Sequence, residues 1–130
     1  MQRAARHNRN VALHSDRLLD HFQNPRNAGH LPPPAVTVDV SNPACGDLLR
    51  LSARFENGRV AEARYQVRGC TASIAAGSAL TEWMTGKTSD DLRTISPATI
   101  EAALGGLEPA SKHAAVLCAD GVKRLLSAVS

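Results

Sequence analysis

Three successive segments of this chain alternate apolar with polar residues, and this pattern constrains the fold more than any other feature. The segments span residues 36–40, 49–55 and 61–67. Because neighbouring side chains of a β-strand point to opposite faces, each segment predicts a strand with one apolar and one charged face. The dipeptide Asn57-Gly58 between the second and third segments is typical of a two-residue hairpin turn. The pattern therefore predicts a three-stranded antiparallel sheet that is solvated on one side.

The residues on either side of this predicted sheet follow helical periodicity. Before the sheet, Leu18, Leu19 and Phe22 lie at helical spacing in a helix predicted over 15–24, with Ser15 as its N-cap. Beyond the sheet the signals predict a helix rich in small residues over 71–85 and a short helical turn that opens at Asp90 and Asp91. They also predict a helix that begins at Pro97 and stops at Gly105-Gly106, and a last helix over 111–129. Helices that cover one face of a small antiparallel sheet make an α+β domain.

Length and composition indicate a single globular domain. The chain has 130 residues, of which 43% are hydrophobic and 21% charged. A net charge of +3 and an aromatic content of 3% argue against nucleic-acid binding. No apolar run approaches the roughly 18 residues that span a membrane. Arg3, Arg6 and Arg9 occur near the start without an acidic residue, so we expect a basic, disordered tail over 1–13 and a folded domain over 14–130.

Four side chains that bind metals stand at predicted element boundaries, namely Cys45, Asp47, Cys70 and His113. Gly46 permits a tight turn through which its two neighbours face one ion, and the helix that starts after Cys70 favours a thiolate there. Two thiolates, an imidazole and a carboxylate complete a tetrahedral zinc shell or a mixed-ligand iron–sulfur site. Taken singly, each residue has a structural alternative, as a turn or junction residue or as a cap.

The odd number of cysteines argues against a disulfide framework and for a reducing compartment, which we take to be the cytoplasm.

Three motifs carry a resemblance to a known family, the IscU/NifU-type iron–sulfur cluster assembly scaffolds. They are His21-Phe22-Gln23-Asn24-Pro25-Arg26-Asn27-Ala28-Gly29, Asn42-Pro43-Ala44-Cys45-Gly46-Asp47 and Arg68-Gly69-Cys70-Thr71-Ala72-Ser73. The resemblance covers roughly residues 14–129 and implies a SufE/NifU-like fold. It also implies a scaffold rather than an enzyme. Such a scaffold receives sulfur from a cysteine desulfurase and iron from an iron donor, assembles a transient [2Fe–2S] cluster and passes it to apo iron–sulfur proteins. The family's ligand positions, for the cluster or for Zn²⁺, match Cys45, Asp47, Cys70 and His113.

The chain departs from the family pattern in two places. Ala114 stands where the family's third cysteine directly follows the histidine. Residues 107–111 keep only part of the proline-rich stretch that a dedicated Hsp70 chaperone recognises. Cys118 lies one helical turn further on, where it either replaces the missing sulfur or, as its stripe with Val122 and Leu125 indicates, is a buried core residue.

Two other functions fit the same ligands. One is a zinc-bound sulfur acceptor that works with a cysteine desulfurase, in which a cysteine leaves the metal and takes up a persulfide. The other is a degenerate family member that binds zinc structurally or serves only as an interaction module. A homodimer that shares one cluster is a further way to supply ligands. Hydrolase chemistry has no support, because the sequence has no Gly-x-Ser-x-Gly elbow and no phosphate-binding loop.

Overall fold

The computed structural model describes residues 14–43 and 46–129, so the expected basic tail over 1–13 lies outside the described residues. The strands are β1 (Val36–Ser41), β2 (Leu48–Glu56) and β3 (Arg59–Arg68), and the helical elements are α2 (Asp16–Gln23), α3 (Thr71–Met84), α4 (Ser89–Leu92), α5 (Pro97–Ala103), the 3₁₀ turn η2 (Pro109–Ser111) and α6 (His113–Val129). The predicted α+β class is confirmed, with elements close to the predicted boundaries. Within the described ranges, every helix is too short or too polar to cross a membrane.

The sheet is antiparallel, in the order β1-β2-β3. Across its inner face Leu51 of β2 lies between Val38 of β1 and Tyr65 of β3, and all three side chains are buried. The hairpin between β2 and β3 turns at Asn57 and Gly58, whose φ angles are +53° and +78°. Two consecutive left-handed residues match the right-handed twist of the flanking strands, so the dipeptide closes the hairpin as predicted.

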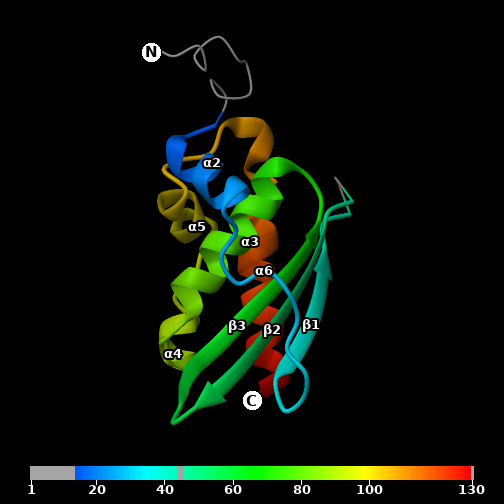
Figure 1. Ribbon diagram of the computed structural model, residues 1–130, viewed down its shortest axis with the longest axis vertical. Helices are drawn as coiled ribbons and strands as arrows, with labels where there is room; N and C mark the ends of the chain where they lie inside the picture. The colour runs from blue at the N-terminus through cyan, green and yellow to red at the C-terminus, as the bar shows by residue number, and fades with distance from the viewer. Residues whose placement is uncertain (1–13, 44–45, 130) are drawn as a thin grey trace.

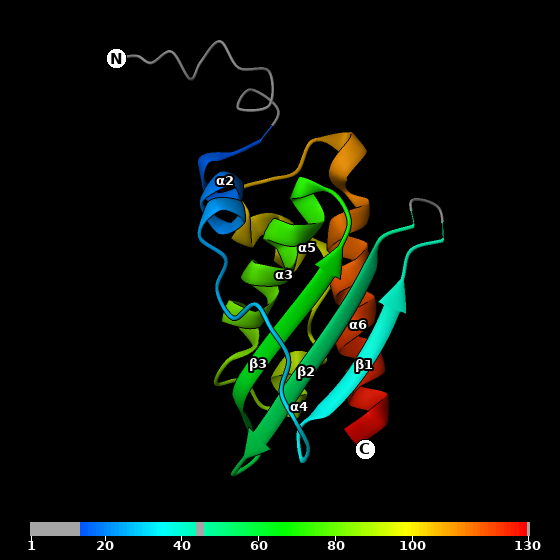
Figure 2. The ribbon, with the colours of Figure 1, turned by 45° about the vertical axis from the view of Figure 1, so that its right-hand side comes forward.

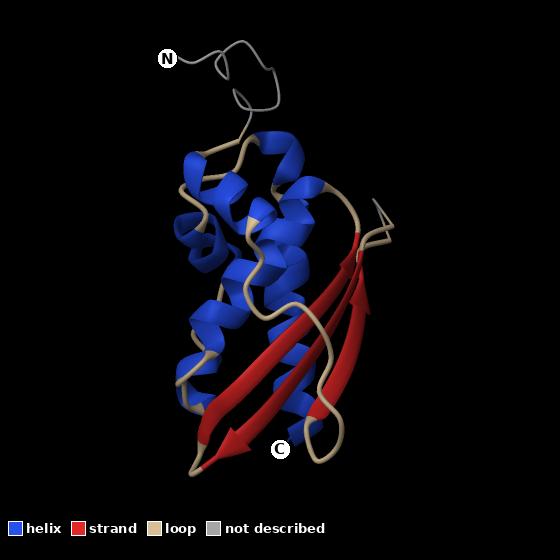
Figure 3. Cartoon of the chain, in the orientation of Figure 1, coloured by secondary structure: helices blue, strands red, loops and turns tan. Residues whose placement is uncertain are grey.

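Two helices cover the inner face of the sheet, α3 along β3 and α6 along β1 and β2 (Figures 1 and 3). The small residues of α3 let its backbone approach the sheet closely. At Gly77, an added Cβ would lie 2.3 Å from Cδ2 of Tyr65, so the helix backbone rests directly on the aromatic ring. This close packing holds the start of α3 in a defined place at the end of β3.

The outer face of the sheet is less solvated than the charge pattern predicts. The segment between α2 and β1 crosses this face, as Figure 2 shows, and its Gly29 donates a backbone hydrogen bond of 2.8 Å to Tyr65 of β3. Further along, His30 lies over Ser52, with 3.4 Å between Nδ1 and Oγ. Ser52 is consequently fully buried although it points away from the helices. The segment covers part of the face that sequence alternation assigned to solvent.

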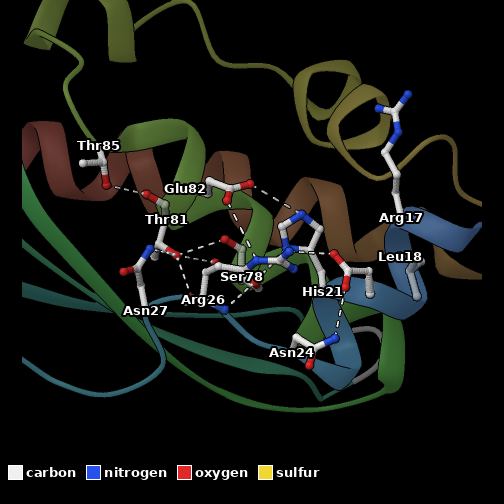
Figure 4. Close-up of polar contacts among 12 residues, drawn as sticks. Arg17, Leu18, His21, Asn24, Arg26, Asn27, Ser78, Thr81, Glu82 and Thr85 are labelled. Atoms are coloured by element: carbon white, nitrogen blue, oxygen red, sulfur yellow. Dashed lines mark hydrogen bonds and ion pairs between the residues drawn. The ribbon is translucent and has the colours of Figure 1, made fainter.

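Helix α2 is attached to α3 by the polar contacts that Figure 4 shows, and it also packs on α3. Leu18 is fully buried as its spacing predicts, but Phe22 is 37% exposed and its neighbour His21 is buried instead. Nδ1 of His21 lies 2.7 Å from Oγ of Ser78, which also accepts a hydrogen bond of 2.8 Å from the backbone N–H of Arg26. Burial, reinforced by the nearby Arg26 charge, lowers the pKa of His21, so the imidazole is neutral at pH 7.

Candidate metal centre

The ends of three parts of the chain meet at one end of the molecule. The β1–β2 connection, the start of α3 and the start of α6 all lie toward the end at which α2 also lies (Figure 1). Asp47 comes from the first, Cys70 from the second and His113 from the third. Three of the four predicted ligands are therefore brought together, although 23 residues separate Asp47 from Cys70 and 43 separate Cys70 from His113.

Asp47 is held in place by the loop that joins β1 to β2. Its carbonyl oxygen accepts a hydrogen bond of 2.9 Å from the backbone N–H of Asn42, and Gly46 donates one of 2.7 Å to the carbonyl of Asn42. Gly46 has a φ of +77°, a conformation that a residue with a Cβ rarely adopts. The turn directs the Asp47 side chain inward, where only 6% of the residue is exposed. A carboxylate so deeply buried needs a partner, since desolvation of an unpaired charge is costly.

Cys70 is the N-cap residue of α3 and is exposed. This position is the N-terminus of a 14-residue helix, where the helix dipole favours negative charge. Gly69, the residue before it, lets the Asp47 side chain approach the backbone at the end of β3 closely. An added Cβ on Gly69 would lie 2.7 Å from Cγ of Asp47, so the absence of a side chain makes room for the carboxylate.

His113 is the first residue of α6 and is partly exposed. The 3₁₀ turn η2 precedes it and is stabilised by Glu108, whose carboxylate accepts hydrogen bonds from the Ser111 hydroxyl and, at 3.2 Å, from the backbone N–H of Ala110. These hydrogen bonds, that of Ser111 above all, lower the pKa of Glu108. The capped turn sets the direction in which α6 begins and hence the position of the imidazole.

The three donor atoms have the spacing of ligands around one ion. Nε2 of His113 lies 3.3 Å from Oδ2 of Asp47 and 3.7 Å from Sγ of Cys70, and the sulfur lies 3.8 Å from the same carboxylate oxygen. Ligand atoms bound at about 2.0–2.3 Å to a tetrahedral ion stand roughly 3.3–3.8 Å apart. The three residues thus fit one zinc or iron ion on three sides.

Ser73 is a part of this cluster that the sequence reasoning did not identify. It lies in the first turn of α3, three residues after Cys70, with 1% of its surface exposed. Its hydroxyl donates a hydrogen bond to Oδ2 of Asp47 and lies 3.4 Å from the Cys70 sulfur. The sequence did indicate that Ser73 lies near Cys70, because residues i and i+3 share a helix face. It did not indicate the contact with Asp47, which is distant along the chain.

The other two cysteines are Cys118, which the structure describes, and Cys45, which it does not. Cys118 is buried, and burial raises the pKa of its thiol to about 12. Its side chain is therefore a protonated, small core residue rather than a thiolate that replaces the missing family cysteine. Ala114, which stands at that family position, is also fully buried. Cys45 lies outside the described residues, so its place relative to the other donors stays a prediction.

Comparison with known proteins identifies relatives of this chain along most of its length. The family model described as the NifU-like N-terminal domain matches residues 13–129. The iron–sulfur cluster assembly scaffold protein IscU of Azotobacter vinelandii is 40% identical over 114 residues, which cover 85% of this chain and 88% of that protein. IscU 1 of Archaeoglobus fulgidus, with the same description, is 37% identical over 88% of this chain and 74% of its own length. The iron–sulfur cluster assembly enzyme IscU of Drosophila melanogaster is 36% identical over 90% of this chain and 78% of its own length.

Solved structures share the fold at lower sequence identity. The N-terminal part of a NifU-like protein from Brucella abortus superposes with a TM-score of 0.69 at 20% identity, covering 89% of this chain and 95% of that one. A candidate scaffold protein for the SUF system of Fervidobacterium islandicum AW-1 gives a TM-score of 0.73 at 17% identity, with 88% and 97% coverage. These likenesses confirm the predicted NifU-like architecture.

Proposed function

Because this chain belongs to the family of NifU-like N-terminal domains, we propose that it is a scaffold on which an iron–sulfur cluster is assembled and from which the cluster passes to apo-proteins. Relatives that are 37% and 40% identical bear the name of such scaffolds. The single observation that carries the proposal for this chain is the meeting of Asp47, Cys70 and His113 within 4.8 Å of one another. An exposed thiol, a carboxylate and an imidazole at one point suit the binding of iron and sulfur, the two substrates of assembly.

We assign the ligands as Cys45, Asp47, Cys70 and His113. Cys45 directly precedes the left-handed Gly46, and this turn supports its role as a second thiolate near Asp47. Two thiolates are the softer donors that iron–sulfur clusters require, whereas the carboxylate and the imidazole bind an incoming iron ion before sulfide is present. The working unit in this proposal is the domain over 14–130.

The accessibility of the donors suits a site that is loaded by other proteins. Cys70 is exposed and Asp47 is buried beneath it, so a sulfur atom delivered by a cysteine desulfurase reaches the thiol from solvent. An iron donor and apo iron–sulfur proteins would use the same open side. In this scheme the protein holds and hands over its cargo and catalyses no reaction of its own, in a reducing compartment such as the cytoplasm.

A second candidate function, a zinc-bound sulfur acceptor for a cysteine desulfurase, is favoured by one observation. The 3.3–3.8 Å separations among the three donor atoms are those of ligands around a single ion. Resident Zn²⁺ would hold the thiol of Cys70 as a thiolate, and release of that sulfur from the ion would free it to accept sulfur. The two candidates differ in the metal that stays bound and in whether a chromophore develops.

The test is anaerobic reconstitution of the purified protein with iron, a cysteine desulfurase and cysteine, after its zinc and iron content has been measured. We expect a visible charge-transfer spectrum that is lost in Cys70→Ala and Cys45→Ala and weakened in Asp47→Ala and His113→Ala. Size-exclusion chromatography before and after reconstitution then shows whether two chains share one cluster. Stoichiometric zinc, stimulation of the desulfurase and no chromophore would instead support the sulfur acceptor.

Matched controls separate loss of the site from loss of the fold. Cys118→Ala removes a thiol from the core. His30→Ala removes an exposed imidazole from the face of the sheet that the helices do not cover. Both should reconstitute like the wild type. If the wild type binds neither metal, or if the variants of Cys70 and His113 behave like these controls, the proposed site is wrong.

A further inference from the structure

The carboxylate of Asp47 has a fixed hydrogen-bond donor in the described residues, the hydroxyl of Ser73. The hydroxyl donates to Oδ2, the same oxygen that lies 3.3 Å from Nε2 of His113 and 3.8 Å from Sγ of Cys70. Ser73 is almost completely buried and belongs to the first turn of a helix whose backbone rests on the sheet. The donor is therefore held by a rigid element and not by a loop.

This contact determines which way the carboxylate turns. Asp47 has two rotatable side-chain bonds, and the space beside it exists because Gly69 has no Cβ. Without the Ser73 hydroxyl, the buried carboxylate would keep only its longer contacts with the sulfur and the imidazole and could rotate away from them. With the Ser73 hydroxyl bonded to Oδ2, the carboxylate stays within reach of both.

We propose that Ser73 is a positioning residue that orients the Asp47 carboxylate toward an ion shared with Cys70 and His113, an inference that rests on the proposed metal site. A serine hydroxyl has one proton and serves one acceptor at a time, and here the charged carboxylate is the stronger acceptor. The hydroxyl proton therefore goes to the carboxylate and not to the Cys70 sulfur, which lies 3.4 Å from the same hydroxyl. Residues that hold a ligand in this way usually change metal affinity about 10–100-fold when they are replaced.

The experiment is a titration of the apo-protein with cobalt(II), with competition by a chelator, for wild type, Ser73→Ala, Asp47→Ala and the double variant. We expect Ser73→Ala to weaken cobalt(II) binding about 10–100-fold and to shift the visible d–d bands, while the thiolate-to-cobalt charge-transfer band of Cys70 persists. In the Asp47→Ala background the same substitution should have no further effect, because the carboxylate that Ser73 orients is gone. A serine that only stabilised the fold would not give this coupling or this spectral change.

Ser52→Ala is the matched control, since it also removes a fully buried, hydrogen-bonded hydroxyl, but on the outer face of the sheet. It should lower the unfolding free energy without changing cobalt(II) affinity. The proposal is overturned if Ser73→Ala binds cobalt(II) as tightly as wild type, if it loses the same factor in the Asp47→Ala background, or if Ser52→Ala weakens binding equally. Failure of the wild type to bind cobalt(II) at all refutes the metal site itself, whereas tight wild-type binding with an unaffected Ser73→Ala rejects only the role of Ser73.

Discussion

Replacement of Gly69 by alanine tests how the backbone makes room for the candidate metal centre. Gly69 does not have a left-handed φ, so an alanine there meets no backbone strain. Its Cβ would lie 2.7 Å from Cγ of Asp47 and 2.8 and 2.9 Å from the two carboxylate oxygens. The perturbation is therefore a single methyl group directed at a single ligand.

Two opposing effects set the size of the change in stability. Insertion of a methyl group into a packed site typically costs about 1–3 kcal/mol. Replacement of glycine by alanine where the backbone conformation is allowed typically stabilises by about 0.4–1 kcal/mol through the unfolded state. The carboxylate is hydrogen-bonded to Ser73 and cannot move aside freely. We expect Gly69→Ala to lower the unfolding free energy by roughly 1–2 kcal/mol.

Urea unfolding of the apo-protein and cobalt(II) titration measure the two consequences separately. Displacement of Asp47 should weaken cobalt(II) binding, and removal of the clashing carboxylate should reverse the sign of the stability effect. In an Asp47→Ala background, Gly69→Ala is thus expected to stabilise by about 0.4–1 kcal/mol. Wild-type affinity and stability in Gly69→Ala, or the same destabilisation in both backgrounds, would refute the reasoning.

Three further predictions concern the fold and the thiols. Gly77→Ala should lower the unfolding free energy by about 1–3 kcal/mol or more in urea, because its Cβ would lie 2.3 Å from the ring of Tyr65. The unfolding free energy should fall as pH drops below about 6.5, since the pKa of buried His21 is lowered in the folded state and the unfolded chain binds the proton more tightly. Comparison of wild type with His21→Gln in urea between about pH 7.5 and about pH 5.5 measures that contribution. In the native protein an alkylating reagent should modify exposed Cys70 and spare Cys118, whose thiol pKa is about 12, as peptide mass spectrometry would show.

Each of these predictions has a clear contrary result. A Gly77→Ala protein as stable as the wild type would mean that α3 does not rest on the aromatic ring as described. An equal pH dependence in His21→Gln and wild type would remove His21 as the cause of acid sensitivity. Rapid alkylation of Cys118 under native conditions would show that its helix opens to solvent, and would restore its candidacy as a sulfur carrier.

Local signals in the sequence were sufficient to predict the elements and their type. Period-two alternation and the Asn57-Gly58 turn depend on neighbours only, so the three strands and the hairpin followed directly. Exposure depends on distant segments and was predicted less well. Ser52 is buried because His30 lies over it, and Phe22 is exposed because α2 is attached to α3 through His21 and Ser78.

The amino-acid sequence specifies the chemistry that is available to this protein, namely soft and hard donors that stand at element boundaries and belong to family motifs. Which of these donors share a site depends on how the chain folds. Burial raises the pKa of the Cys118 thiol and so excludes this residue from the set of metal ligands. The packing of α3 and α6 on one sheet places the donor atoms of Asp47, Cys70 and His113 at 3.3–3.8 Å from one another. Ligand geometry and desolvation depend on distances between residues far apart in the chain, whereas periodicity in the sequence reports only on near neighbours. Ser73 illustrates this, since its place on α3 was predictable and its bond to Asp47 was not.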